Sequence, residues 1–263
     1  MTERVILTFD VEEFDIPCEY GQPVPPDVQL EVGSRGLEAV RALLERCGIT
    51  ATLFTTAHFA QHQDQTIRYL ASRHEIASHG FWHSRFAPAD LAASRAVLRQ
   101  ISGQEVIGFR MARMAPVDTT AIAAAGYLYN SSENPIWLPG RYNNWGKPRR
   151  PYLVGDLVNI PVSASPGWRV PLFWLGVKNF PMGLIRREAG RTLAHDGAVN
   201  FYFHPWEFTD LSAYRLPWYV RRHSGQGMMD RVESLVHWLR RRAEFVTFAT
   251  YLQIIRPELQ PQR

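Results

Sequence analysis

Apolar and β-branched residues gather in short runs along the chain, and longer stretches with helical periodicity separate these runs. Each run has the length and composition typical of a buried strand. The predicted strands are 5–9, 51–55, 75–78, 105–109, 157–162, 199–203 and 245–248.

The stretches between the runs place apolar residues three and four positions apart, which predicts helices with one buried face. Such helices are expected at 37–47, 91–101, 118–126 and 228–238. Alternating strands and helices favour a parallel sheet covered by helices, and we expect the sheet to close into a barrel. No Gly-x-Gly-x-x-Gly follows the first strand, which disfavours a dinucleotide-binding fold.

Two stretches interrupt this alternation, 17–32 and 134–155, and both are rich in Pro, Gly or Asn. We expect them to be long loops over the active-site end of the barrel, because loops of this length in a compact domain are usually functional. The prediction is one α/β catalytic domain that spans residues 1–263.

Four polar residues each follow a different predicted strand directly. They are Asp10, His79, Arg110 and His204. In a parallel barrel the carboxyl ends of the strands meet on one face, where active sites are built. We therefore expect these four side chains to lie close together.

His79 and His83 have the spacing that places two imidazoles on one face of a helical turn. With a carboxylate from the segment Asp10-Val11-Glu12-Glu13 they make a three-ligand metal site that keeps positions open for water and substrate. The alternative is two ordinary histidines. Glu13 and Asp15 are expected to lie in a solvated turn.

Pro205 restricts His204 to an extended backbone, which fixes the direction of its ring. Arg110 lies in an apolar setting, and a buried arginine needs an anionic partner. Asp10 is the expected partner.

The net charge of +4 and the arginine clusters at 186–187, 221–222 and 240–242 are typical of solvated helix faces, and no nucleic-acid motif accompanies them. Cys18 and Cys47 form no disulfide framework, which fits a reducing compartment. We find no signal peptide and no run of about 20 apolar residues that could span a membrane, so a cytoplasmic location is expected.

These residues resemble the polysaccharide deacetylase family, which is carbohydrate esterase family 4 with a nodulation-deacetylase-like domain. The resemblance runs in order over roughly residues 4–250. The matching segments are Leu7-Thr8-Phe9-Asp10, Ala51-Thr52-Leu53-Phe54, the stretch 75–83, Gly108-Phe109-Arg110 and Phe203-His204-Pro205-Trp206-Glu207, the last in a His-Pro-Trp form found in one branch.

The resemblance implies a distorted (β/α)7-type barrel and a metal-dependent hydrolase that removes an N-acetyl or N-formyl group from an amino sugar. It implies Asp10 as catalytic base, Arg110 as the residue that orients it, and His204 as the acid. His79, His83 and a carboxylate would hold a divalent ion, for which Zn²⁺ is favoured by the nitrogen-rich ligands and other divalent ions remain open.

Three departures from the family pattern affect the site. The usual adjacent aspartates are replaced by Asp10-Val11-Glu12, so Glu12 is the expected carboxylate ligand and Glu13 the fallback. Gly80 follows His79 where Ser or Thr is usual, and the prolines that commonly follow the arginine are absent. We further assign substrate binding to Trp82, Trp206 and Glu207.

Alternative functions remain open on this pattern. A related branch hydrolyses cyclic ureides, as allantoinase does. A non-catalytic sugar-binding barrel would keep the aromatic residues, and two histidines with a carboxylate also describe a non-haem iron oxygenase. A homo-oligomer is also left open.

The substrate is expected to be a lipid-linked or nucleotide-linked precursor in cell-surface polysaccharide synthesis. The segments 166–180 and 216–222 combine aromatic, apolar and basic residues. They are explained either by packing over the barrel or by peripheral contact with anionic lipid at the inner membrane face, because Trp and Tyr favour the headgroup level.

Overall fold

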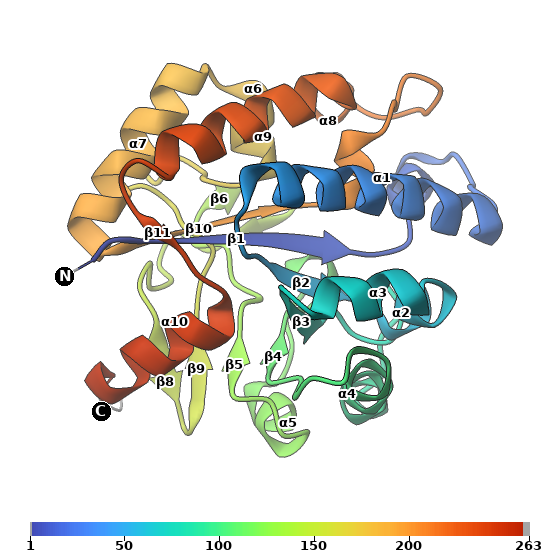
Figure 1. Cartoon of the computed structure of the whole chain (residues 1–263), viewed down its shortest axis with the longest axis horizontal. Helices are drawn as coiled ribbons and strands as arrows, with labels where there is room; N and C mark the ends of the chain where they lie inside the picture. Colours follow the sequence, from blue (N-terminus) through green and yellow to red (C-terminus); the bar gives the residue numbers. More distant parts are fainter. Residues whose placement is uncertain (1, 260–263) are drawn as a thin grey trace.

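Nine strands form a curled mixed sheet in the computed structural model, which describes residues 2–259. The sheet makes a half-barrel with helices on its outer side (Figure 1). Its strands are β1 (Arg4–Val11), β2 (Thr52–Thr55), β3 (Glu75–Ser78), β4 (Gly108–Phe109), β5 (Tyr129–Asn130), β8 (Tyr152–Val154), β9 (Leu157–Asn159), β10 (Ala198–Phe203) and β11 (Glu244–Phe245).

The strand order is β10-β1-β2-β3-β4-β5-β9-β8, and β11 pairs with β1. All neighbours along β10-β1-β2-β3-β4-β5-β9 are parallel, whereas β8 and β9 form an antiparallel hairpin. The chain beyond β9 bridges toward β10, because the Ser163 N–H donates to the Asn200 carbonyl at 3.1 Å and the Asn200 N–H donates to Ser163 Oγ at 2.8 Å. The expected α/β class and distorted barrel are confirmed.

The helices surround this sheet. They are α1 (Pro26–Cys47), α2 (Ala57–His62), α3 (Asp64–Ala71), α4 (Ala89–Ser102), α5 (Thr119–Ala124), α6 (Trp174–Asn179), α7 (Met182–Asp196), α8 (Trp218–Arg221), α9 (Gln226–Leu239) and α10 (Phe248–Ile255). Short 3₁₀ turns are η1 (Ile16–Tyr20), η2 (Ala112–Met114), η3 (Pro205–Phe208) and η4 (Arg256–Glu258), and a small hairpin pairs β6 (Trp137–Leu138) with β7 (Tyr142–Asn143).

Strand β1 shows how the sequence pattern orients the site. Side chains alternate across a strand. Val5, Leu7 and Phe9 belong to the large hydrophobic core, whereas Ile6 belongs to the second cluster, with residues of β2, β3, β5 and α10. Asp10 is four residues after Ile6, so both side chains project from the same face of β1. The opposite face packs against the large core under the outer helices, and Asp10 therefore points inward at the carboxyl end of the strand.

The predicted strands at 5–9, 51–55, 75–78 and 199–203 are confirmed almost to the residue. Only 108–109 of the predicted 105–109 pairs in the sheet, and the run at 245–248 ends early because Phe248 begins α10. The loop predicted at 17–32 is wrong from residue 26 onward. Pro26 begins α1, since proline is well tolerated in the first turn of a helix.

Several observed elements were not expected from the sequence pattern. The predicted loop 134–155 contains the β6–β7 hairpin and β8. Strand β5 and helices α2, α3, α6, α7, α8 and α10 were not predicted. None of the described helices is long and apolar enough to cross a membrane.

Candidate active site

The side chains that follow the predicted strands meet at one end of the half-barrel. Asp10 is the seventh residue of β1, and His79, Arg110 and His204 come directly after β3, β4 and β10. His79, Arg110 and Asp10 are almost completely buried, and His204 retains a small exposed surface. The structure therefore brings the four sequence-derived residues together.

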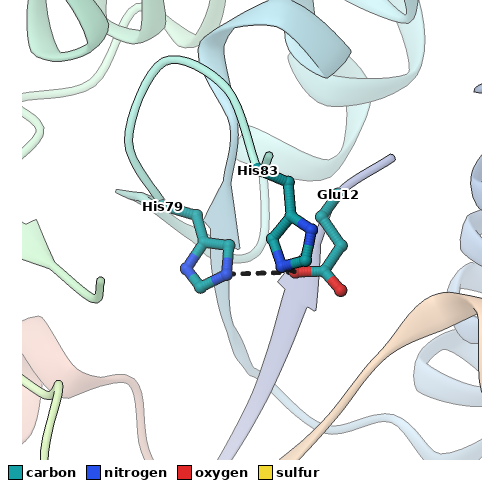
Figure 2. Close-up of side chains that lie close together, drawn as sticks. All are labelled: Glu12, His79 and His83. Atoms are coloured by element: carbon teal, nitrogen blue, oxygen red, sulfur yellow. Dashed lines mark hydrogen bonds and ion pairs between the residues drawn. The ribbon is translucent and has the colours of Figure 1, made fainter. Parts of the chain in front are cut away.

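Glu12, His79 and His83 form a buried cluster whose possible ligand atoms all lie within 4.8 Å of one another. Figure 2 shows both imidazoles turned toward the Glu12 carboxylate. Nε2 of His79 and Nε2 of His83 each lie 3.0 Å from Glu12 Oε2. Two nitrogens and one carboxylate oxygen are the donor set of catalytic zinc sites that keep one position open.

The outer nitrogens of these rings explain why a cation fits here. Nδ1 of His79 lies 2.9 Å from the carbonyl oxygen of Arg110, and Nδ1 of His83 lies 2.7 Å from Asp15 Oδ1. Both partners only accept hydrogen bonds, so each Nδ1 carries the proton. In a neutral ring Nε2 then presents a lone pair to the acceptor Glu12 Oε2, which is unfavourable unless a proton or a metal ion lies between them.

The electrostatics of the cluster agree with this reading. Although burial opposes it, the carboxylates of Glu12 and Asp15 raise the pKa of His83 to about 9. Burial also opposes ionisation of Glu12, yet the neighbouring imidazoles hold the pKa of Glu12 well below its usual range. The site thus favours positive charge beside a Glu12 carboxylate, and a divalent ion supplies such charge.

The segment that carries the two histidines is a loop, so the helical turn predicted for it is wrong. Gly80 has φ +86°, a left-handed conformation that favours glycine, and this reverses the chain directly after His79. The departure from Ser or Thr at this position is therefore a backbone requirement. The reversal lets His83 reach the same Glu12 oxygen as His79, with the two rings stacked 5.8 Å apart.

Asp10 and Arg110 form a buried ion pair next to the cluster. Arg110 Nη1 donates to Asp10 Oδ1 at 2.6 Å and to Thr8 Oγ1 at 2.9 Å, and Nε and Nη2 donate to the Ser131 carbonyl and hydroxyl. The guanidinium also lies 4.0 Å from the centre of the Phe54 ring. Because so many contacts hold Arg110, the orientation of the Asp10 carboxylate is fixed.

His204 is held by Glu207 from behind. Glu207 Oε1 accepts from His204 Nδ1 at 3.0 Å and from the His204 backbone N–H at 2.9 Å, which leaves Nε2 directed at Asp10 Oδ2, 3.9 Å away. The backbone of His204 is extended, as Pro205 predicts. Burial works against it, but Glu12, Glu207 and Asp10 together raise the pKa of His204, which favours a protonated ring.

Behind Glu207 lies Lys178, a basic residue of the segment 166–180. Lys178 is completely buried, so this residue of the segment packs inside the fold and is not available to lipid. Its Nζ lies 3.2 Å from Glu207 Oε2 and donates to the Val220 carbonyl at 2.9 Å. Its burial lowers the pKa of Lys178, an effect that Glu207 opposes.

Asp15 and Arg113 form a layer behind His83 that the sequence reading missed. Arg113 donates to Asp15 Oδ2 at 2.9 Å and to the His83 carbonyl at 2.8 Å. Asp15 is buried, so the solvated turn expected for Glu13 and Asp15 is wrong. Glu13 instead accepts hydrogen bonds from Thr56 and lies 2.6 Å from His58, away from the metal cluster.

The three residues assigned to substrate binding lie in different places. Trp82 packs against His58 and Arg85. Trp206 is buried, stacks on His204 and donates its indole N–H to Glu12 Oε1 at 3.0 Å. Glu207 is completely buried behind His204. Trp206 and Glu207 therefore hold the Glu12 and His204 side chains in place.

Helix α1 supports this arrangement from outside. A Cβ atom on Gly36 would lie 2.1 Å from the Pro205 carbonyl oxygen, so only glycine allows this approach. The turn η3, which carries Pro205 and Trp206, packs directly on the helix at this point.

A cavity of 510 Å³ opens in front of the site. Glu12, His83, His204 and Trp206 form its inner end. This volume lies in the usual range for pockets that bind small molecules.

Comparison with known proteins agrees with this geometry. Residues 2–129, which include Asp10, Glu12, His79, His83 and Arg110, match the family model described as polysaccharide deacetylase. Over these residues the chain is similar to the polysaccharide deacetylase family. No curated protein sequence matches the chain significantly.

Three solved structures illustrate the range of proteins with this polysaccharide deacetylase-like fold. A candidate polysaccharide deacetylase from Mycobacterium smegmatis is 18% identical, with a TM-score of 0.68 over 99% of this chain and 92% of that chain. Puue allantoinase is 15% identical, with a TM-score of 0.58 over 92% and 85%. A family 4 pseudoenzyme from Bacillus anthracis, BA3943, is 8% identical, with a TM-score of 0.51 over 95% and 65%.

Proposed function

We propose that this protein is a metal-dependent hydrolase that removes an N-acyl group, acetyl or formyl, from an amino sugar. The observation that carries the proposal is the meeting of two imidazole Nε2 atoms on one carboxylate oxygen, directly beside a fixed Asp10–Arg110 pair and a fixed His204. A metal face, a base and an acid on one cavity are the components that amide hydrolysis needs.

Glu12, His79 and His83 would hold the divalent ion. When bound there, such an ion polarises an acyl carbonyl and lowers the pKa of water. Nitrogen-rich ligation favours Zn²⁺. Glu12 is oriented by the Trp206 indole, and the rings of His79 and His83 are fixed through their Nδ1 atoms.

Asp10 would act as the base. Its Oδ1 is occupied by Arg110, which leaves Oδ2 to accept the proton of an attacking water molecule. General-base assistance of this kind typically contributes about 10²–10⁴-fold to the rate.

His204 would act as the acid. Glu207 fixes Nδ1, so Nε2 is the nitrogen that faces Asp10 Oδ2 and the cavity. As the carbon–nitrogen bond breaks, Nε2 donates its proton to the departing amine. The products are the carboxylic acid and the free amino sugar.

One experiment tests the proposal against its rivals. Purified protein is analysed for bound metal and incubated with N-acetyl and N-formyl amino sugars and with a cyclic ureide. The proposed function predicts about one divalent ion per chain and release of acetate or formate that stops after chelation. Ring opening of the ureide alone would indicate the allantoinase-like alternative. Binding of sugars without turnover in metal-loaded protein would indicate a non-catalytic barrel.

A further inference from the structure

The cavity in front of the site has a largely apolar wall. Beyond the inner end its lining is dominated by apolar and aromatic side chains of several elements. They include Ile16 from η1, Met114 from η2, Leu138 from β6, and Phe173, Leu175 and Tyr219 from the two segments that the sequence analysis singled out. Where apolar side chains form this wall, sugar hydroxyls would find no hydrogen-bond partners, which disfavours a sugar at these positions.

The same two segments form the rim of the cavity. Trp218, Tyr219 and Phe180 line it and are exposed to 64%, 40% and 37%. Trp174 lines the cavity too, but it is buried and stands edge-on to His204. Apolar and aromatic side chains of these segments therefore line the cavity from the neighbourhood of His204 to its exposed rim.

The charged groups of the wall argue against a nucleotide diphosphate. The guanidinium groups among the lining residues belong to Arg113 and Arg141. Arg113 is paired with Asp15 and Glu19, and Arg141 is paired with Glu19. Two phosphates would also meet the carboxylate of Glu19, which lines the same cavity and competes for both guanidinium groups.

We infer that this cavity binds a long apolar chain that is covalently attached to the acylamino sugar. The substrate class is then an amphiphilic glycoconjugate, rather than a free sugar or a nucleotide sugar. This inference rests on the proposed function, because it places the sugar amide at the inner end. Because the proposed function releases acetate or formate, the chain is attached to the sugar itself and not through the amide nitrogen.

Two substrate series distinguish these attachments. One series holds alkyl glycosides of N-acetylglucosamine, and the other holds glucosamine with N-acyl chains of increasing length, all below micelle-forming concentrations. Burial of one methylene contributes about 0.8 kcal/mol, which is roughly fourfold. We expect kcat/KM to rise roughly two- to fourfold per methylene in the glycoside series, until the chain reaches the rim. A rise in the N-acyl series alone, or no rise in either series, overturns the inference.

Leu175→Asp tests the wall itself. Leu175 is half-buried and lines the cavity, so a carboxylate there should flatten the dependence on chain length. Leu138→Asp on the facing hairpin provides a second variant should the first fail to fold. Leu128→Asp is the matched control, because Leu128 is 37% exposed and is not among the lining residues. An unchanged slope in both wall variants would contradict the inference.

A binding measurement separates this inference from the proposed function. Decyl glucoside carries no amide, so calorimetry with this probe needs no turnover. We expect saturable binding that is at least tenfold weaker in Leu175→Asp and unchanged in Leu128→Asp. Binding without any acyl release would leave the chain site standing and refute the hydrolase. Acyl release without binding or chain-length dependence would refute the chain site and leave the hydrolase standing.

Discussion

The buried pair of Lys178 and Glu207 offers a sharp test of how His204, the proposed acid, is held in place. Lys178→Met keeps the length of the side chain but leaves the Glu207 carboxylate without its counter-charge and the Val220 carbonyl without its donor. Both members of the pair have no exposed surface. Removing one partner of such a pair typically destabilises a protein by about 3–5 kcal/mol, because the other charge stays buried.

In a chain of this size each kcal/mol shifts the melting temperature by about 2–4 °C, so Lys178→Met should lower Tm by roughly 6–20 °C. The double variant Lys178→Met with Glu207→Gln removes both charges. Its Tm should therefore fall by clearly less than the sum of the two single effects, with a coupling energy of about 0.5–3 kcal/mol.

The control is Lys147→Met. Lys147 pairs with Glu133 at 2.9 Å, but its side chain is 48% exposed, so loss of this pair should cost less than about 1 kcal/mol. Differential scanning calorimetry at one heating rate measures all four variants. A Tm loss below 2 °C for Lys178→Met, or strict additivity in the double variant, would refute the reasoning.

Three further outcomes follow from the site. Asp10→Asn should retain metal and lower kcat by about 10²–10⁴-fold, because it removes the base but no ligand; a near wild-type rate would exclude Asp10 as the base. Glu12→Gln should reduce bound metal sharply in elemental analysis, whereas the matched Glu13→Gln should keep it, since Glu13 faces Thr56. Equal occupancy in the two variants would disprove this assignment. His204→Ala should slow amide hydrolysis more than hydrolysis of an activated ester, because only the amine needs a proton to leave; equal slowing would reduce His204 to a positioning role.

The strand pattern was sufficient to predict where the candidate active-site residues meet. Asp10, His79, Arg110 and His204 could be placed because each directly follows a run of buried residues, and the geometry of a parallel sheet then brings strand ends together. The strands that were missed or shortened are two or three residues long, and so short a run carries little periodicity.

The second layer of the site could not be predicted in this way. Asp15 and Lys178 are charged residues, which are usually exposed, and their burial depends on partners distant in the sequence. Arg113, with a side chain 30% exposed, is recognised only through its contacts with Asp15 and His83. Arg113 lies 98 positions from Asp15. The positive φ of Arg113, +57°, is likewise a product of the folded surroundings.

The contact at Gly36 has a consequence for how this protein could be engineered. Helix α1 touches the turn after His204 through backbone rather than through side chains, and Trp206 in that turn holds Glu12. Any side chain introduced at Gly36 cannot escape by choosing another rotamer, so the turn itself would have to move. Such a shift would displace His204 and Glu12, the proposed acid and a proposed metal ligand, together. If these roles hold, substitution at this outer helix position would change metal affinity and turnover jointly.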